Sequence, residues 1–275
     1  MPRRYQYDVA PHKVVHGVMM DLDELHVDER AQRSLNELRA QKLSEGWINE
    51  AAGEIVVSDR GPDKKKHVID GYHRSTAARM TGISKLPCEV HYGLSVADEA
   101  ALFLLKNRES SKPNALDEYR IGLTAELPLF VDTEKVLIKH NLTVGKASSK
   151  NVVGAVQAIL RITETSGPGT LDEVLRIAEA AWGRTAETWD GMLLGGLGLF
   201  LHRHGGEVNI GDLIQRMRRK EAWAWKQTVL SLASNQNRTQ SGTGSRVTAC
   251  YQELCRVYNK GRRNERTKIS PAGRG

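Results

Sequence analysis

The sequence predicts an α+β protein in which a small α/β domain precedes an all-helical domain. Before Pro113, short β-branched runs bounded by turn residues alternate with segments of helical spacing, whereas the chain from Leu116 onward contains no convincing strand. A chain of 275 residues is long enough for two ordinary domains. We therefore expect an α/β domain over 1–120, a helical domain over 121–260, and a disordered basic tail over 261–275.

Turn residues and apolar spacing define the elements of the first domain. Gly46 marks the end of a helix, and Gly61-Pro62 forms the turn between two short strands. Gly71 marks the point where a strand passes directly into a helix that contains an alanine pair. The expected strands cover 14–20, 55–57, 68–69 and 86–90, and the expected helices cover 34–45, 74–80 and 96–106.

Breaks rich in Gly, Pro, Ser and Asn divide the second part of the chain into helices. The change in composition over 112–127 marks the boundary between the two domains. The expected helices cover 133–140, 149–163, 171–182, 185–202, 210–219, 223–233 and 246–259.

The formal net charge of +7 is concentrated late in the chain. Residues 260–275 contain six Lys or Arg against the single acid Glu265. Such a block either contacts nucleic acid or keeps a tail solvated, and both interpretations stay open. Three cysteines at unpaired spacings indicate reduced thiols, and no apolar run is long enough to span a bilayer. We expect a cytoplasmic protein with no membrane partner.

The segment Asp70-Gly71-Tyr72-His73-Arg74-Ser75 is the strongest candidate site. It lies between a strand and the first turn of a helix, where unpaired backbone N–H groups and the positive end of the helix dipole attract anions. Gly71 permits a sharp turn, and Arg74 is expected to be the strongest contact. The alternative is structural: Asp70 caps the helix, Arg74 pairs with a surface acid, and His73 fills a crevice.

Several motifs in order resemble the ParB/sulfiredoxin superfamily over roughly Leu25 to Arg120. Gln32-Arg33 corresponds to an early element of that superfamily, without its proline. The run from Val68 to Ala78 corresponds to its Gly-x-His-Arg phosphate loop and Ala-rich helix, and Leu104 to Glu109 to its Asn-containing motif. The pattern is most similar to ParB-like proteins of bacteriophages and plasmids, which would place the protein in a bacterial host cell.

The resemblance implies a nucleoside triphosphate, CTP or ATP, on the Gly71–Arg74 loop, and a homodimer. Two residues depart from the family pattern. Lys106 replaces the acid that binds metal, so that Mg²⁺ would depend on Asn107, and Tyr72 replaces the sulfiredoxin cysteine, which excludes that enzyme's chemistry. The residues implied to contact nucleotide or phosphate are Gln32, Arg33, Gly71, Tyr72, His73, Arg74, Ser75, Asn107 and Arg108.

Carboxylates near these motifs are candidates for acid–base catalysis. Asp70 and Glu29 are the catalytic candidates, with Asp28 as a further one; short acids at such junctions are more often helix caps. An enzyme of the same fold, either an NTP-dependent kinase or NTPase or a nuclease, is therefore an alternative to a nucleotide-binding, DNA-associated protein. An accessory factor in phage DNA modification is another.

A helix-turn-helix is expected near 132–160. Its second helix would present short polar and basic residues to a DNA groove, although any two amphipathic helices give the same pattern. The basic end of the last helix would add contacts to the phosphate backbone. The expected DNA-binding residues are Lys146, Ser148, Ser149, Lys150, Asn151, Arg262 and Arg263.

Overall fold

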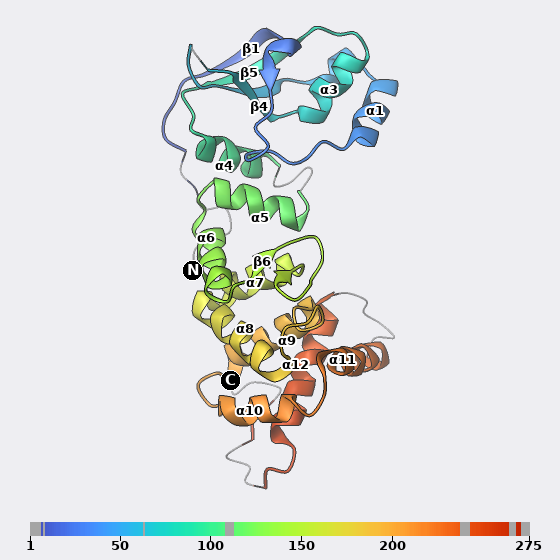
Figure 1. Cartoon of the computed structure of the whole chain (residues 1–275). Coiled ribbons are helices and arrows are strands. Elements are labelled where there is room, and N and C mark those ends of the chain that lie inside the picture. Colours follow the sequence, from blue (N-terminus) through green and yellow to red (C-terminus); the bar gives the residue numbers. More distant parts are fainter. Residues whose placement is uncertain are drawn as a thin grey trace. The chain divides into compact units, whose positions relative to one another are not determined.

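The computed structural model describes residues 7, 9–62, 64–107, 113–236, 243–263 and 268–270. The chain forms two compact units that divide between Pro128 and Leu129. The first is an α/β unit and the second is helical, which confirms the predicted α+β class (Figure 1). The expected boundary at residue 120 falls inside a helix that was not predicted, α5 (Ala115–Thr124), which Asn114 caps through its side chain.

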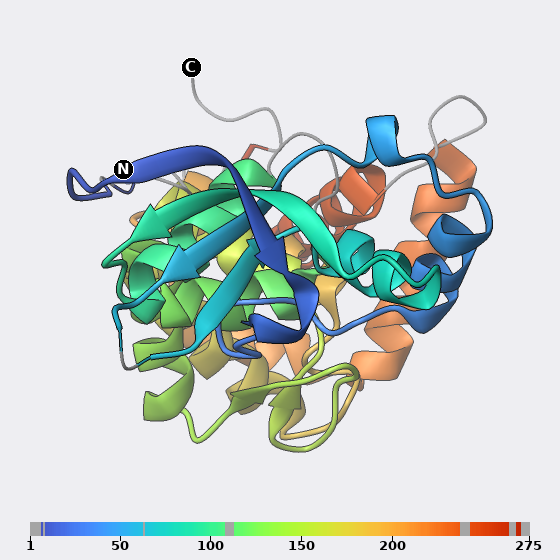
Figure 2. The same cartoon turned by 90° about the horizontal axis from the view of Figure 1, so that it is seen from above.

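A five-stranded sheet forms the centre of the first unit, and Figure 2 shows its strands from above. The strand order is β1-β5-β3-β4-β2, in which β1–β5 and β3–β4 are antiparallel and β5–β3 and β4–β2 are parallel. The strands are β1 (Val14–Asp21), β2 (Leu25–His26), β3 (Ile55–Asp59), β4 (Lys66–Asp70) and β5 (Lys85–Tyr92).

Side chains alternate between the two faces of the sheet along each strand, and a helix covers each face. Ile55 and Cys88 are paired in register and belong to one buried cluster with Ala78 of α3 (Tyr72–Met80), so α3 covers that face. The neighbouring Glu89 lies on the opposite face and binds Lys106 of α4 (Val96–Lys106). Helix α1 (Glu37–Glu45) packs against α3, and the short α2 (Asn49–Ala52) and 3₁₀ turn η1 (Leu22–Glu24) complete this unit.

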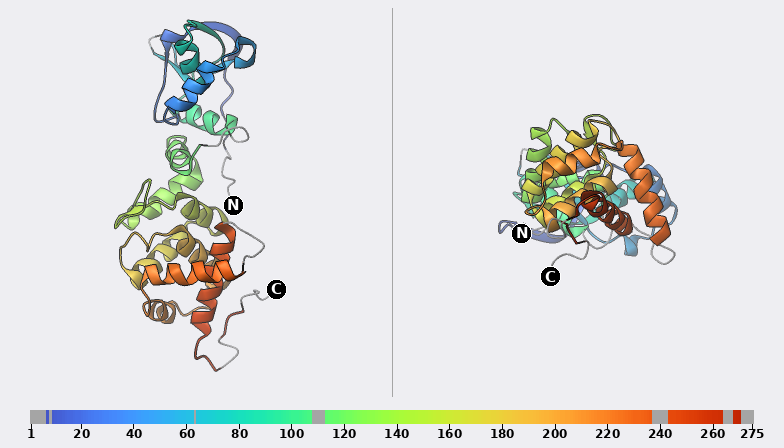
Figure 3. Two further views of the ribbon diagram at one scale, coloured as in Figure 1. Left: turned by 90° about the vertical axis from the view of Figure 1, so that its right-hand side faces the viewer. Right: turned by 90° about the horizontal axis from the view of Figure 1, so that it is seen from below.

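Helix α9 (Gly191–His204) lies at the centre of the second unit and contacts α7, α8, α11 and α12. Figure 3 shows the ribbon of this unit in two further views. The glycines of α9 allow close approach: a Cβ on Gly196 would lie 2.4 Å from Cys250 Sγ, and one on Gly198 would lie 2.7 Å from Ile162 Cγ1. The other helices are α6 (Pro128–Lys139), α7 (Val156–Ser166), α8 (Pro168–Trp182), α10 (Ile210–Met217), α11 (Ala222–Gln236) and α12 (Thr243–Asn259). Among the described residues, no helix is both long and apolar enough to cross a bilayer.

Candidate functional site

Gly71 gives α3 a bare N-terminus at the end of strand β4. Gly71 has a left-handed backbone, with φ of 97°, and α3 starts at the next residue. A Cβ at this position would lie 2.6 Å from Ile55 Cδ1, so both the backbone and the space require glycine. The helix has no side-chain cap and no acid in its first turn. Its first N–H groups carry partial positive charge, and the Asp70 carboxylate just before them binds Arg74 and Asn107 instead of capping them.

Arg74 braces this turn from within the protein. Its Nη1 donates to the backbone carbonyls of Ala52 (2.6 Å) and Glu54 (3.0 Å), and its Nη2 pairs with Asp70 at 3.1 Å. A Cβ on Gly71 would also lie 3.1 Å from Nη2. Arg74 thus pairs with an acid, as the structural alternative expected, but the acid is Asp70 of the same loop. The expected contact of Arg74 with a ligand stays a prediction.

His73 is a neutral, buried member of the site. Its Nε2 accepts a hydrogen bond from the Asn36 backbone N–H at 3.1 Å, at the start of α1. Burial, together with the positive charges of Arg33 and Arg39, lowers the pKa of His73 to about 4. His73 is therefore uncharged near pH 7, and the positive charge here comes from the two arginines. Burial and the neighbouring Arg39 lower the pKa of Arg33 as well.

Two buried amides join the surrounding segments to strand β4 and Asp70. Gln32 Nε2 donates to the carbonyls of Val68 (3.3 Å) and Ile69 (2.6 Å) near the end of β4. Asn107, which follows α4, donates from Nδ2 to Asp70 Oδ1 at 3.3 Å and to Phe103 O at 3.0 Å. The sequence motifs that were expected to share a site are thus brought to one place.

Three other residues that were predicted to belong to the site are Ser75, Glu29 and Arg108. Ser75 is buried and its hydroxyl donates to the Tyr72 carbonyl at 2.9 Å, within the first turn of α3. Glu29 is exposed in the turn before Gln32. Arg108 lies outside the described residues.

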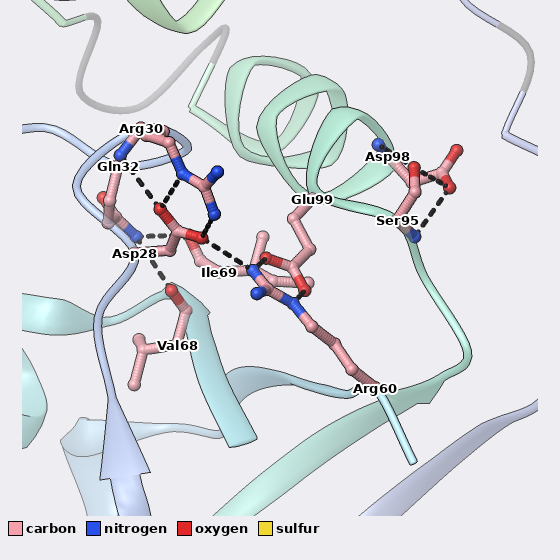
Figure 4. A network of polar contacts seen from close by, with 9 residues as sticks. All are labelled: Asp28, Arg30, Gln32, Arg60, Val68, Ile69, Ser95, Asp98 and Glu99. Atoms are coloured by element: carbon pink, nitrogen blue, oxygen red, sulfur yellow. Dashed lines mark hydrogen bonds and ion pairs between the residues drawn. The ribbon is translucent and has the colours of Figure 1, made fainter. Parts of the chain in front are cut away.

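A network of ion pairs, which the sequence did not predict, links the turn before Gln32 to helix α4 beside the site (Figure 4). Arg60, after β3, binds Glu99 of α4 through Nε (2.7 Å) and Nη2 (2.5 Å), and Nη2 also binds Asp28 at 3.0 Å. Arg30 pairs with Asp28 as well, and these bonds hold the pKa of Asp28 well below its usual range. Asp28 is therefore an ion-pair partner here and not a poised base. No local pattern marks Arg60 and Glu99 as partners.

Lys106 forms an ion pair with Glu89 of strand β5 and not with the Gly71 loop. Its ammonium binds Glu89 Oε1 at 2.9 Å and Oε2 at 3.0 Å. Asn107 uses its amide nitrogen in both described bonds, which leaves Oδ1 as the atom that could face a cation. Binding of Mg²⁺ at Asn107 stays a prediction.

The prediction of a second helix for the helix-turn-helix is wrong over residues 149–155, the first part of the expected helix. Helix α7 begins at Val156, and the residues before it form a loop with two short parallel strands, β6 (Thr143–Val144) and β7 (Val152–Val153). The reason is tertiary: Trp189 Nε1 donates to the Lys150 carbonyl at 3.1 Å, and Arg184 Nη1 binds Asn151 Oδ1 at 3.0 Å. Gly154 allows the chain to close on itself, since a Cβ there would lie 2.6 Å from Ser148 N.

This loop contains the five predicted DNA-binding residues between positions 146 and 151. Lys146, Ser149, Lys150 and Asn151 are exposed, whereas the half-buried Ser148 donates to the Trp189 carbonyl at 3.3 Å. A pocket of about 380 Å³ lies beside the loop. Its lining includes Lys146, Ser148, Trp189, Asp190 and Lys226.

Two residues near the basic end of the chain, Arg262 and Ile269, contact helix α12 or its last residue. Arg262 lies over the Tyr258 ring, 4.1 Å from its centroid, and pairs with Asp212. The Asn259 side chain donates from Nδ2 to the backbone carbonyl of the buried Ile269 at 2.8 Å, and its Oδ1 accepts from the Ile269 backbone N–H at 3.0 Å. These residues belong to the helical unit and not to a disordered tail, because both pack on α12 and its end. Arg263 is exposed.

Comparisons with known proteins give similarities in structure only. No protein-family model matches the sequence, and no curated protein matches it. One similar structure is the C-terminally truncated chromosome-partitioning protein ParB from Caulobacter crescentus, complexed with CTP-gamma-S. It is 17% identical, with a TM-score of 0.31, over 57% of this chain and 91% of that chain. Another is a Pnob8-like ParB-N domain, which is 13% identical, with a TM-score of 0.38, over 88% and 97%.

Proposed function

We propose that this chain binds a nucleoside triphosphate at the N-terminus of α3 and associates with DNA through its helical unit. The observation that carries the first part is the uncapped turn at Gly71, next to the positive charges of Arg33 and Arg39. CTP is the preferred nucleotide because the ordered motifs resemble those of ParB-like proteins. The same resemblance supports a homodimer and a phage or plasmid origin.

The chemistry of the site suits a polyphosphate. Backbone N–H groups at a helix start bind phosphate oxygens, and arginines add charge-assisted hydrogen bonds. Arg74 supports the turn by holding Asp70 and the Ala52–Glu54 segment, so the N–H groups stay oriented when no ligand is bound. Catalysis is not part of the proposal, because Asp70 is shared by Arg74 and Asn107 and Asp28 is held by Arg30 and Arg60.

The first test measures thermal stabilisation by CTP, ATP, GTP and UTP, each with Mg²⁺ and with EDTA. We expect CTP to raise the melting temperature, because a ligand that binds only the folded state stabilises it. Replacing Arg33 or Arg39 by glutamine removes one cation and is expected to weaken CTP binding roughly tenfold or more.

The control is Arg176→Gln, which makes the same change on the exposed surface of α8. CTP affinity should be unchanged in that variant. Absence of stabilisation by every nucleotide, or equal CTP affinity in the wild type and in the Arg33→Gln/Arg39→Gln double variant, would contradict the proposal.

Association with DNA is proposed to use the loop between β6 and β7. Lys146 and Lys150 are exposed there, and the loop is fixed by Trp189 and Arg184 and so loses little conformational freedom on binding. Exposed lysines on a fixed loop bind backbone phosphates and displace counterions. The loop thus takes the role first expected of a helix N-terminus.

The second test measures the affinity for a duplex oligonucleotide by fluorescence anisotropy across a series of salt concentrations. Removing two phosphate contacts with Lys146→Gln/Lys150→Gln should reduce the slope of log K against log salt by about 2. A control with two other cations removed, Lys135→Gln/Arg176→Gln, should keep the slope of the wild type. The loop assignment is wrong if both double variants change the slope equally.

A further inference from the structure

We propose that His16, Glu54 and Glu89 form a binding site for one divalent transition-metal ion, with Zn²⁺ as the best fit. Among the residues that the structure describes, this is the one group of three metal-ligating side chains in which one ligand atom from each lies within 4.8 Å of the others. One imidazole and two carboxylates, with positions left for water, suit Zn²⁺ and its neighbours in the first transition row.

The sheet topology brings the three residues together from distant parts of the sequence. Strand β5 pairs with β1 on one side and with β3 on the other. His16 lies in β1 where the register shifts, between Val15 and Val18, and Glu54 directly precedes β3. Alternation places Glu54 and Glu89 on the same face of the sheet, the one covered by α4.

Two of the ligands are already positioned. His16 Nδ1 lies 3.0 Å from Glu54 Oε2, and the Gly17 backbone N–H donates to the other oxygen, Oε1, at 2.8 Å. Two ligand atoms on one Zn²⁺ lie roughly 3.0–3.4 Å apart, given bond lengths of about 2.1 Å. A metal ion can therefore take the place of the proton between Nδ1 and Oε2, and the neutral imidazole then carries its proton on Nε2.

Glu89 is oriented by a chain of imidazoles. His91 Nε2 lies 2.7 Å from Glu89 Oε1, and His91 Nδ1 lies 2.7 Å from His12 Nε2. Partners of this kind fix the direction of a ligating carboxylate and raise metal affinity. His91 is thus a positioning residue for the site.

Lys106 is the built-in competitor for the metal. Its ammonium binds both oxygens of Glu89, at 2.9 and 3.0 Å, so a divalent ion has to share or displace that charge. Removing the ammonium while keeping a polar side chain should therefore strengthen metal binding.

The experiment titrates the metal-free full-length chain with Zn²⁺ by calorimetry and with Co²⁺ by visible absorption, in the absence of nucleotide. We expect one ion per chain and the d–d bands of a bound Co²⁺. His16→Asn and Glu54→Gln should each weaken binding at least roughly tenfold, since each removes one of three protein ligands. Lys106→Gln should tighten it at least roughly fivefold.

The matched control is His202→Asn, because His202 is also exposed and bonds a neighbouring hydroxyl, that of Ser166. Its affinity should equal that of the wild type, and circular dichroism verifies that every variant is folded. Unchanged affinity in His16→Asn, or equal losses in His16→Asn and His202→Asn, would overturn the proposal, as would weaker binding in folded Lys106→Gln. These readouts do not depend on nucleotide binding.

Discussion

Replacing Gly71 by alanine is expected to lower the free energy of unfolding by about 2–4 kcal/mol, through a left-handed backbone and a steric overlap together. The backbone φ of 97° is unfavourable for any residue with a Cβ, and the new methyl would lie 2.6 Å from Ile55 Cδ1. Urea denaturation of the purified variant measures the loss. Nucleotide binding should fall as well, because the turn that orients the N–H groups of α3 is displaced.

Two further variants separate the causes. Gly82 has a similar φ of 80°, but a Cβ there meets nothing within 4 Å, so Gly82→Ala should show the backbone cost alone. Shortening Ile55 to valine removes the overlapping Cδ1, so Gly71→Ala/Ile55→Val should be less destabilised than the sum of the single variants. If Gly71→Ala costs no more than Gly82→Ala, the steric explanation fails.

Replacing Arg60 by methionine is expected to destabilise the first unit by about 3–5 kcal/mol, because it leaves the buried Glu99 carboxylate without its partner and removes one of the two cations bound to Asp28. The Glu99 side chain is 2% exposed and the Asp28 side chain 9%. The network joins the turn that contains Asp28 to helix α4, so its loss should also loosen Gln32 and Asn107 around Asp70. Chemical denaturation measures the first effect, and the affinity for CTP measures the second.

A matched pair of variants tests this interpretation of Arg60. Arg30→Met removes the other cation bound to Asp28, but the Arg30 side chain is 68% exposed, so the cost should be below about 1 kcal/mol. Arg60→Met/Glu99→Leu replaces both partners by apolar groups and should recover much of the stability lost in Arg60→Met. Equal effects of Arg30→Met and Arg60→Met would contradict a buried network.

The regular elements of the first unit could be predicted because their signals are local. The helix expected over 96–106 is α4, with the capping box of Ser95 and Asp98 at its start, and Gly71 starts α3 as expected. Helix α5 was missed, because its short amphipathic pattern follows a change in composition that indicated a linker. For α3 and α4, the residues that mark the start of the helix lie within a few positions of it.

The sequence by itself determined the α+β class, the order of the longer elements of the first unit except α5, and the turn at Gly71, because hydrophobic period and backbone preference are properties of neighbouring residues. Only the tertiary structure decided which groups meet. It paired Arg74 with Asp70 and Arg60 with Glu99, and it made the 145–151 segment, between β6 and β7, a loop held by Trp189. Contacts between residues far apart in the chain depend on how the sheet and helices pack, and no local pattern encodes that packing.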